Sequence, residues 1–251
     1  MRRRDMRDLL VMWKNPKMVA IVAITALLYF GSLFPFRGLT AFGGYADFGR
    51  VGVGIPVAFS FLFGPAAAWG AAIGTVLRDI AEAQLDASSV FGFFGNLILG
   101  YLPFKLWGML TKEKPDLRSV KKLLLFMGGG VLACAVCGLT IGWGLFWLGF
   151  TPFMPTAAII ALTNALWVVT VGALVLALSY NFVSNHKLRY QDILKPDQPQ
   201  ENDEKGKKAT VLALVAVSVC CFLLGVAFEC SPLMLLPFIA VTLALTVTAM
   251  R

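Results

Sequence analysis

The chain has 251 residues, of which 58% are hydrophobic and only 14% are charged. This apolar fraction exceeds that of ordinary soluble domains and indicates a polytopic membrane protein. A formal net charge of +8 would suit a nucleic-acid-binding protein, but the positions of the basic residues along the chain favour membrane topology as their explanation.

Apolar segments near the length needed to cross a bilayer, about 20 residues, recur along the chain. We expect eight helices, at about 18–36, 50–64, 66–84, 90–110, 123–149, 156–182, 209–228 and 233–250. A cytoplasmic N-terminus then puts all of the 22 basic residues except Arg37, Arg50 and Arg78 on the cytoplasmic side. Because cytoplasmic loops are enriched in Lys and Arg, this pattern predicts an even number of helices and two cytoplasmic termini.

The alternation of apolar and polar stretches divides the chain into four parts. Residues 1–17 form a basic, interfacial N-terminal segment, and residues 18–182 contain six helices. Residues 183–208 form a polar cytoplasmic linker, and residues 209–251 form a C-terminal transmembrane hairpin rich in Leu, Val and Ala. The expected fold class is therefore all-α, a polytopic membrane helix bundle with a six-helix core and an added two-helix hairpin.

The segment between the first two predicted helices is too rich in Gly and aromatic residues to be a simple tight turn. It carries Phe42 and Tyr45 and ends at Arg50. Such a loop can fold over an outward-facing pocket and stack on a flat ligand, or it can form an interfacial aromatic belt. Both interpretations remain open. The next helix is short and contains Gly54 and Pro56, which predicts a bent or partly opened backbone.

The third predicted helix carries a stripe of small residues that ends in charges. Ala66, Gly70, Gly74, Arg78 and Glu82 follow one another at four-residue spacing and therefore share one helix face. Small residues let another helix approach closely. We therefore expect a packed seam that leads into a polar pocket.

Three charged residues lie near the outer end of this helix: Arg78, Asp79 and Glu82. An ionisable residue inside the membrane indicates a functional site by default, because its burial must be offset by a partner or a wet cavity. The alternative is a structural ion pair between Arg78 and Glu82. At a similar depth in later helices lie Asn96 and Asn164, which can bind a ligand or join helices by hydrogen bonds.

These positions predict one substrate pocket near the outer leaflet. An Arg beside aromatic rings suits a planar ligand that bears a carboxylate or phosphate. The residues expected to form the pocket are Arg78, Asp79, Glu82, Asn96 and Asn164, capped by Phe42, Tyr45 and Arg50.

Motifs for other chemistries are absent from the sequence. It contains no G-x-x-x-x-G-K-[ST] loop for ATP, no H-E-x-x-H and no G-x-S-x-G motif. Acid–base catalysis by Asp79 and Glu82 is conceivable, but no nucleophile or metal-binding set accompanies them. The Cys134-x-x-Cys137 pair lies in a long apolar helix, where we expect it to pack. We therefore expect neither an enzyme nor a bound metal or cofactor.

One region resembles a known family. Its motifs are Gly-Ile-Pro-Val at 54–57, Phe-Leu-Phe-Gly-Pro-Ala-Ala-Ala-Trp-Gly-Ala-Ala-Ile-Gly at 61–74, Arg78-Asp79, Ser-x-Phe-Gly-Phe-Phe-Gly-Asn at 89–96 and Gly-Tyr-Leu-Pro-Phe-Lys-Leu-Trp at 100–107. This pattern is similar to the substrate-binding S-component of energy-coupling factor (ECF) vitamin transporters. The resemblance covers residues 18–182, with topology as its main basis outside 54–107.

The resemblance implies a function, partners and a location. It implies a subunit in a prokaryotic cytoplasmic (inner) membrane that binds a vitamin or related micronutrient from outside. The subunit would then deliver the bound vitamin by toppling within a complex that contains a transmembrane coupling protein and two ATPase subunits. The family docks the coupling protein through small residues of the first helix, which here are Ala20, Ala23 and Ala26 at three-residue spacing. The alternatives are a self-contained secondary transporter, which should show internal repeats, and an intramembrane enzyme.

Overall fold

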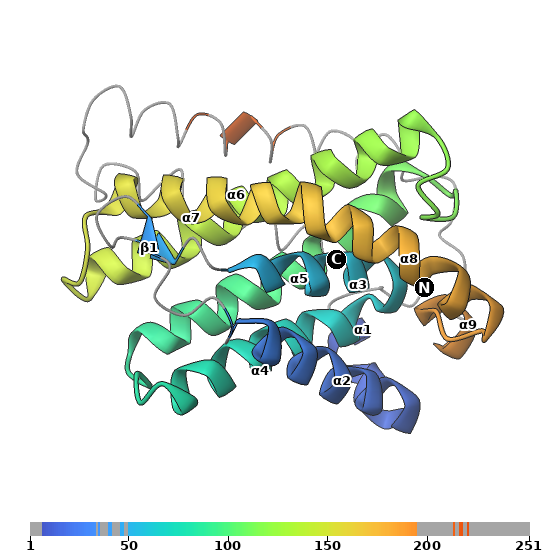
Figure 1. Cartoon of the computed structure of the whole chain (residues 1–251), viewed down its shortest axis with the longest axis horizontal. Helices are drawn as coiled ribbons and strands as arrows, with labels where there is room; N and C mark the ends of the chain where they lie inside the picture. Colours follow the sequence, from blue (N-terminus) through green and yellow to red (C-terminus); the bar gives the residue numbers. More distant parts are fainter. Residues whose placement is uncertain are drawn as a thin grey trace.

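The computed structural model describes residues 7–33, 35, 40–41, 46–47 and 50–194, together with 213, 216, 217 and 220. These residues are mainly helical (Figure 1). The elements in chain order are α1 (Arg7–Val11), η1 (Met12–Lys14), α2 (Pro16–Leu33), β1 (Thr40–Ala41), β2 (Ala46–Asp47), η4 (Val51–Val53), α3 (Gly54–Phe63), α4 (Pro65–Ala81), α5 (Ser88–Leu110), α6 (Val120–Trp147), α7 (Phe153–Trp167), η5 (Val168–Gly172), α8 (Ala173–Asn185) and α9 (Tyr190–Leu194).

Four helical stretches in the described residues are long and apolar enough to cross a membrane. They are Pro16–Leu33, Ser88–Leu110, Val120–Trp147 and Phe153–Leu194. This supports the expectation of a helical, membrane-embedded protein. The α4 helix has 17 residues and α3 only 10, so α3, at about 1.5 Å per residue, is too short to span the hydrocarbon alone.

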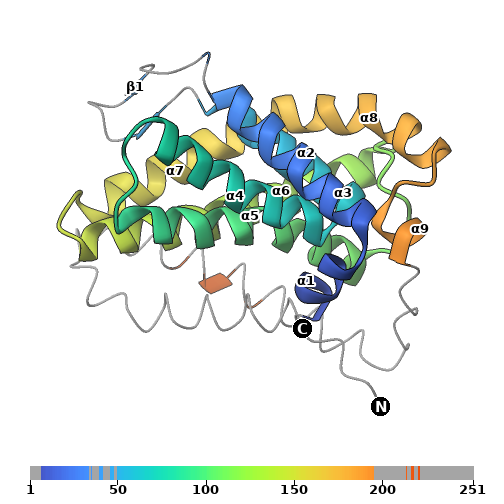
Figure 2. The same ribbon diagram turned by 90° about the horizontal axis from the view of Figure 1, so that it is seen from below.

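The helices pack in sequence, with α3 in the middle. The pairs α2 and α4, α4 and α5, α5 and α6, and α6 and α7 are in contact, while α3 touches α2, α4, α5, α8 and η5 (Figures 1 and 2). In α3 the side chains of Val57 and Ala58 are fully buried. The short, bent helix expected from the glycines near residue 54 is thus enclosed by longer helices.

A sharp turn at Gly64 connects α3 to α4. Gly64 has a φ of +53°, and a Cβ at this position would lie 3.0 Å from the Phe104 ring. Glycine is favoured there because it adopts positive φ without strain. Pro65 then occupies the first turn of α4, where its fixed φ suits helix initiation. The Gly64-Pro65 pair thus forms the turn between α3 and α4.

The α5 helix continues through Pro103 with help from α3. Proline lacks an N–H group and disturbs the hydrogen bonds of the preceding turn. The next amide, that of Phe104, donates a hydrogen bond of 3.1 Å to the Ser60 hydroxyl in α3. Ser60 is fully buried. The bond therefore joins α5 to α3 at the point where the proline interrupts the backbone hydrogen bonds of α5.

The small-residue face of α4 packs against α2. A Cβ on Gly70 would lie 2.5 Å from the Thr25 Cβ, and one on Gly74 would lie 2.9 Å from the Ala26 carbonyl oxygen. No larger residue fits at either position without displacing α2. The seam predicted from the four-residue spacing is therefore present, and α2 is its partner.

Some boundaries differ from those expected. The predicted helix at 156–182 is longer in the structure and consists of α7, the π-helical turn η5 and α8. The loop before Arg50 contains a two-stranded antiparallel ladder that pairs Thr40 with Asp47, which the sequence did not predict. The predicted helices at 209–228 and 233–250 fall outside the described residues, apart from isolated positions.

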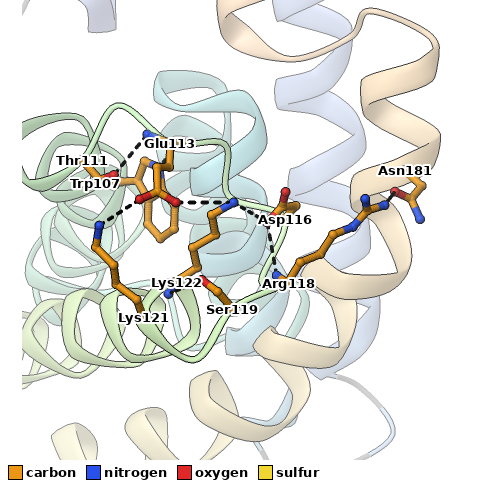
Figure 3. A network of polar contacts seen from close by, with 9 residues as sticks. All are labelled: Trp107, Thr111, Glu113, Asp116, Arg118, Ser119, Lys121, Lys122 and Asn181. Carbon is orange, nitrogen blue, oxygen red and sulfur yellow. Dashed lines mark hydrogen bonds and ion pairs between the residues drawn. The ribbon is translucent and has the colours of Figure 1, made fainter.

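One end of the bundle carries most of the described Lys and Arg residues. Every described Lys and Arg except Arg50 and Arg78 lies at the end where α2 and α6 begin and α5 and α8 end, here called the basic end. The opposite end, which carries β1 and β2, is called the hairpin end. At the basic end the loop between α5 and α6 forms a polar network, drawn in Figure 3.

The network holds this loop against three helices. Lys122 pairs with Asp116 at 2.8 Å, and the Trp107 indole N–H donates to the Glu113 carbonyl oxygen at 2.8 Å (Figure 3). Arg118 donates to the Asn181 side chain in α8 at 3.1 Å. The loop is thus tied to α5, α6 and α8.

Stability should depend on pH through Asp116. The hydrogen bond from Lys122 holds the pKa of the Asp116 carboxyl below its usual value of 3.8. A depressed folded-state pKa contributes stability that is present above the unfolded-state pKa and is lost as pH falls through the folded-state pKa. We expect Asp116→Asn to lower the thermal midpoint at pH 6 and to make no difference at pH 2. Melting curves of both proteins across this range check the prediction, and a gap between them that persists at pH 2 would contradict it.

Candidate functional site

A buried hydrogen bond joins α2 and α5 in the centre of the bundle. The Tyr29 hydroxyl donates to Asn96 Oδ1 at 3.0 Å, and Asn96 Nδ2 donates to the Gly92 carbonyl oxygen at 2.8 Å. Tyr29 is fully buried and Asn96 is 1% exposed. The absent side chain of Gly74 in α4 makes room for Tyr29, since a Cβ there would lie 3.0 Å from the Tyr29 ring. The seam between α2 and α4 therefore positions the tyrosine.

Towards the hairpin end, the charges of α4 pair with one another. Arg78 Nε lies 3.1 Å from Glu82 Oε2 and 3.8 Å from Asp79 Oδ1, with all three side chains between 11% and 14% exposed. Ser89, at the start of α5, donates to Asp79 Oδ2 at 2.8 Å. The ion pair between Arg78 and Glu82, which was the alternative to a ligand-facing role, is present, and the second oxygen of Asp79 accepts from Ser89 of α5.

Arg50 is a second cation whose charge affects the tyrosine. It immediately precedes η4 and is partly buried. Its charge acts on the side chains of Tyr29 in α2 and Cys137 in α6, and the charge of Arg78 also acts on Tyr29. The hydrogen-bonded pair Tyr29 and Asn96, together with the two cations Arg50 and Arg78 whose charges act on Tyr29, is called the polar region.

Asn164 lies in α7, on the face towards α6. It is 1% exposed, and neither its Oδ1 nor its Nδ2 has a hydrogen-bond partner among the described residues. Its neighbour Thr163 is satisfied, because its hydroxyl donates to the carbonyl oxygen of Ile159 at 2.7 Å. A buried, unpaired carboxamide is costly unless something else fills its hydrogen-bonding capacity.

The predicted site residues therefore fall into three groups. Arg78 contacts Asp79 and Glu82, Asn96 is hydrogen-bonded to Tyr29, and the charges of Arg50 and Arg78 act on Tyr29. Asn164 is buried on a separate helix. The two aromatic residues of the predicted cap, Phe42 and Tyr45, lie outside the described residues.

The three predicted docking residues are on different faces of α2. Ala20 and Ala23 are exposed. Ala26 is 3% exposed and lies against Gly74 of α4. Only the first two are accessible to a partner in the described part of the chain.

Two polar residues of this region were not predicted. Tyr29 and Ser89 carry the bonds that join α4 and α2 to α5. Tyr29 could have been found from its spacing, because it follows Ala26 by three residues and so shares the face that meets α4. Ser89 could have been found only from its position ten residues after Asp79, across the turn.

Comparison of the chain with protein-family models, with curated proteins and with solved structures gave no match.

The described residues contain no group of three or more His, Cys, Asp or Glu side chains placed to hold a metal ion. Cys134 and Cys137 are free thiols and fully buried. The polar region instead contains amide, phenol, guanidinium and carboxylate groups, which can bind a polar organic solute by hydrogen bonds and charge.

Removing the Tyr29 hydroxyl should destabilise the bundle. Tyr29→Phe leaves Asn96 Oδ1 buried without its donor, at an expected cost of about 1–2 kcal/mol in unfolding free energy. Thermal or denaturant unfolding in detergent measures the loss. The double variant with Asn96→Leu should recover part of it, because an unpaired polar atom is then no longer buried. A double variant as unstable as the sum of the single variants would contradict this interpretation.

Proposed function

We propose that this chain is the membrane-embedded solute-binding subunit of an ATP-driven ECF-type importer, which captures a vitamin or related micronutrient from outside. The observation that carries the proposal is Asn164, a buried carboxamide with no hydrogen-bond partner in the described residues, inside an apolar bundle. The motifs between residues 54 and 107 support the same assignment through their resemblance to S-components.

The distribution of charge supports an orientation for this subunit. Basic residues are favoured on the cytoplasmic side, so the basic end would face the cytoplasm and the hairpin end would face outside. Arg78, Arg50 and Asn164 would then be approached by a solute from outside. Both termini would lie in the cytoplasm, and residues 209–251 would form a transmembrane hairpin beside a six-helix core formed by residues 18–182.

The source of energy would be a partner. The sequence has no phosphate-binding loop for ATP, so ATP hydrolysis would be supplied by two ATPase subunits and transmitted by a transmembrane coupling protein. The exposed face of α2 suits such docking, since Ala20 and Ala23 lie beside Ile24 and Leu27, which are 53% and 61% exposed. Small residues there would allow a partner helix to approach closely.

Co-expression tests the proposal directly. The tagged chain should copurify with ECF coupling and ATPase subunits, and proteoliposomes holding the complex should take up solute only with ATP. A complex whose ATPases carry a Lys→Ala change in the phosphate-binding loop serves as the control. Uptake by the purified chain alone, without ATP, would instead identify a secondary transporter, and chemical conversion of the solute would identify an intramembrane enzyme.

A further inference from the structure

We propose that Asn164 binds the ligand directly and that the ligand presents a neutral amide or lactam edge, with a hydrogen-bond donor beside an acceptor. This inference rests on the proposed function, because it names the chemical class of the solute. The bundle contains two buried asparagines, Asn96 and Asn164, of which only Asn96 is hydrogen-bonded.

The two asparagines are equally buried but differently satisfied. Asn96 has a donor for its oxygen, the Tyr29 hydroxyl, and an acceptor for its nitrogen, the Gly92 carbonyl. Asn164 has neither, and the carbonyl four residues earlier in α7, that of Ile160, instead accepts from the Thr163 hydroxyl at 3.3 Å. The hydrogen-bonding capacity of both Asn164 atoms is therefore unused by the described residues, although the side chain is only 1% exposed.

The register between α6 and α7 explains why α6 offers no strong hydrogen-bond partner to the Asn164 side chain. A Cβ on Gly138 would lie 2.5 Å from the Ala157 carbonyl oxygen, and a Cβ on Gly130 would lie 2.6 Å from Val168 Cγ1. Between these two contacts, the antiparallel register places Cys134 at the level of Asn164. A thiol is a weak donor and a weak acceptor, so a cysteine at this level is a poor hydrogen-bond partner for a carboxamide.

The backbone around Asn164 is irregular on two sides. The π-helical turn η5 begins four residues after it, and α7 also contacts η4, which follows Arg50. The close approach of α3 to the π-helical turn requires Gly54, whose Cβ would lie 2.6 Å from the Gly172 nitrogen. Single π-helical turns occur often at functional sites, and irregular backbone inside a membrane requires a protein or polar surrounding.

The chemistry of a carboxamide selects the ligand class. A carboxylate would accept from Nδ2 but leave Oδ1 without a donor, and an ammonium group would do the reverse. A neutral amide or lactam pairs with both atoms in one plane, as asparagine does with the donor–acceptor edge of adenine. This refines the carboxylate- or phosphate-bearing ligand expected from the sequence: an anionic group elsewhere on the solute is compatible, but the part at Asn164 is neutral.

Binding to the full chain in lipid nanodiscs tests the inference. The probes are nicotinamide, uracil and hypoxanthine, each paired with an analogue that lacks the donor: N,N-dimethylnicotinamide, 1,3-dimethyluracil and 1-methylhypoxanthine. We expect at least one probe to bind and its methylated analogue to bind roughly 10- to 100-fold more weakly, because a buried acceptor is left unpaired. Asn164→Leu should weaken the binding of the same probe by a similar factor.

Thr163→Val is the matched control, since Thr163 neighbours Asn164 but is satisfied within its own helix. It should leave probe affinity unchanged. The inference is overturned if no probe binds, if methylation makes no difference, or if Asn164→Leu alters melting temperature without altering probe affinity. ATP-driven uptake that is insensitive to Asn164→Leu would overturn this inference alone, whereas probe binding without any ATP-driven uptake would overturn the proposed importer alone.

Discussion

Gly138→Leu should separate α6 from α7 and destabilise the protein by about 3 kcal/mol, near the upper end of the usual cost of overpacking. A Cβ at this position would already lie 2.5 Å from the Ala157 carbonyl oxygen and 3.0 Å from the Ala161 Cβ. Both neighbours belong to the partner helix and one is backbone, so no side-chain rotation relieves the clash. Unfolding in detergent, followed by tryptophan fluorescence, measures the change.

Gly128→Leu is the control for this experiment. Gly128 lies in the same helix, is exposed, and has no atom within 4 Å of its added Cβ. Because leucine has a higher helix propensity than glycine, the control should be neutral or slightly stabilising. Equal losses for both substitutions would show that α6 tolerates no leucine in general and that the seam with α7 is not the cause.

The positions of the helices were predictable because they depend on local hydropathy. Apolar runs between residues 18 and 182 correspond to helices in the structure. The Gly64-Pro65 pair is typical of a turn into a helix, because glycine tolerates positive φ and proline suits the first turn of a helix. The π-helical turn at Val168–Gly172 was not predicted. It adjoins a close contact with Gly54, more than 100 residues away, and such a contact leaves no mark on the hydropathy of the helix.

The site was predictable where a residue conflicts with the apolar surroundings. Arg78 and Glu82 stand out in an apolar run, and their ion pair follows from their spacing. Tyr29 does not conflict with a core helix, so its bond to Asn96 was missed. The difference between Asn96 and Asn164 could not be predicted, because both are single asparagines in apolar helices and only the three-dimensional neighbours decide which one is satisfied.

Removing the positive charge of Arg78 should have the second large effect. Arg78→Ala leaves Glu82 and Asp79 without the guanidinium that compensates them, in a region where these side chains are only 13–14% exposed. Breaking a fully buried pair costs 3–5 kcal/mol, and the residual exposure here reduces the expected loss to roughly 2–3 kcal/mol. Thermal unfolding at pH 7 measures it, with Arg78→Lys as the variant that keeps the charge and should lose less.

A double-mutant cycle separates this structural role from a role in binding. If the pair acts as a unit, Arg78→Ala combined with Glu82→Ala should be more stable than Arg78→Ala alone, because the uncompensated carboxylate of Glu82 is removed with its partner. Strictly additive losses would contradict the pairing. Solute affinity is then compared between the double variant and Glu82→Ala, because both lack the ion pair and differ only at Arg78. Equal affinity would assign Arg78 to the scaffold. Weaker affinity in the double variant would assign Arg78 to the ligand.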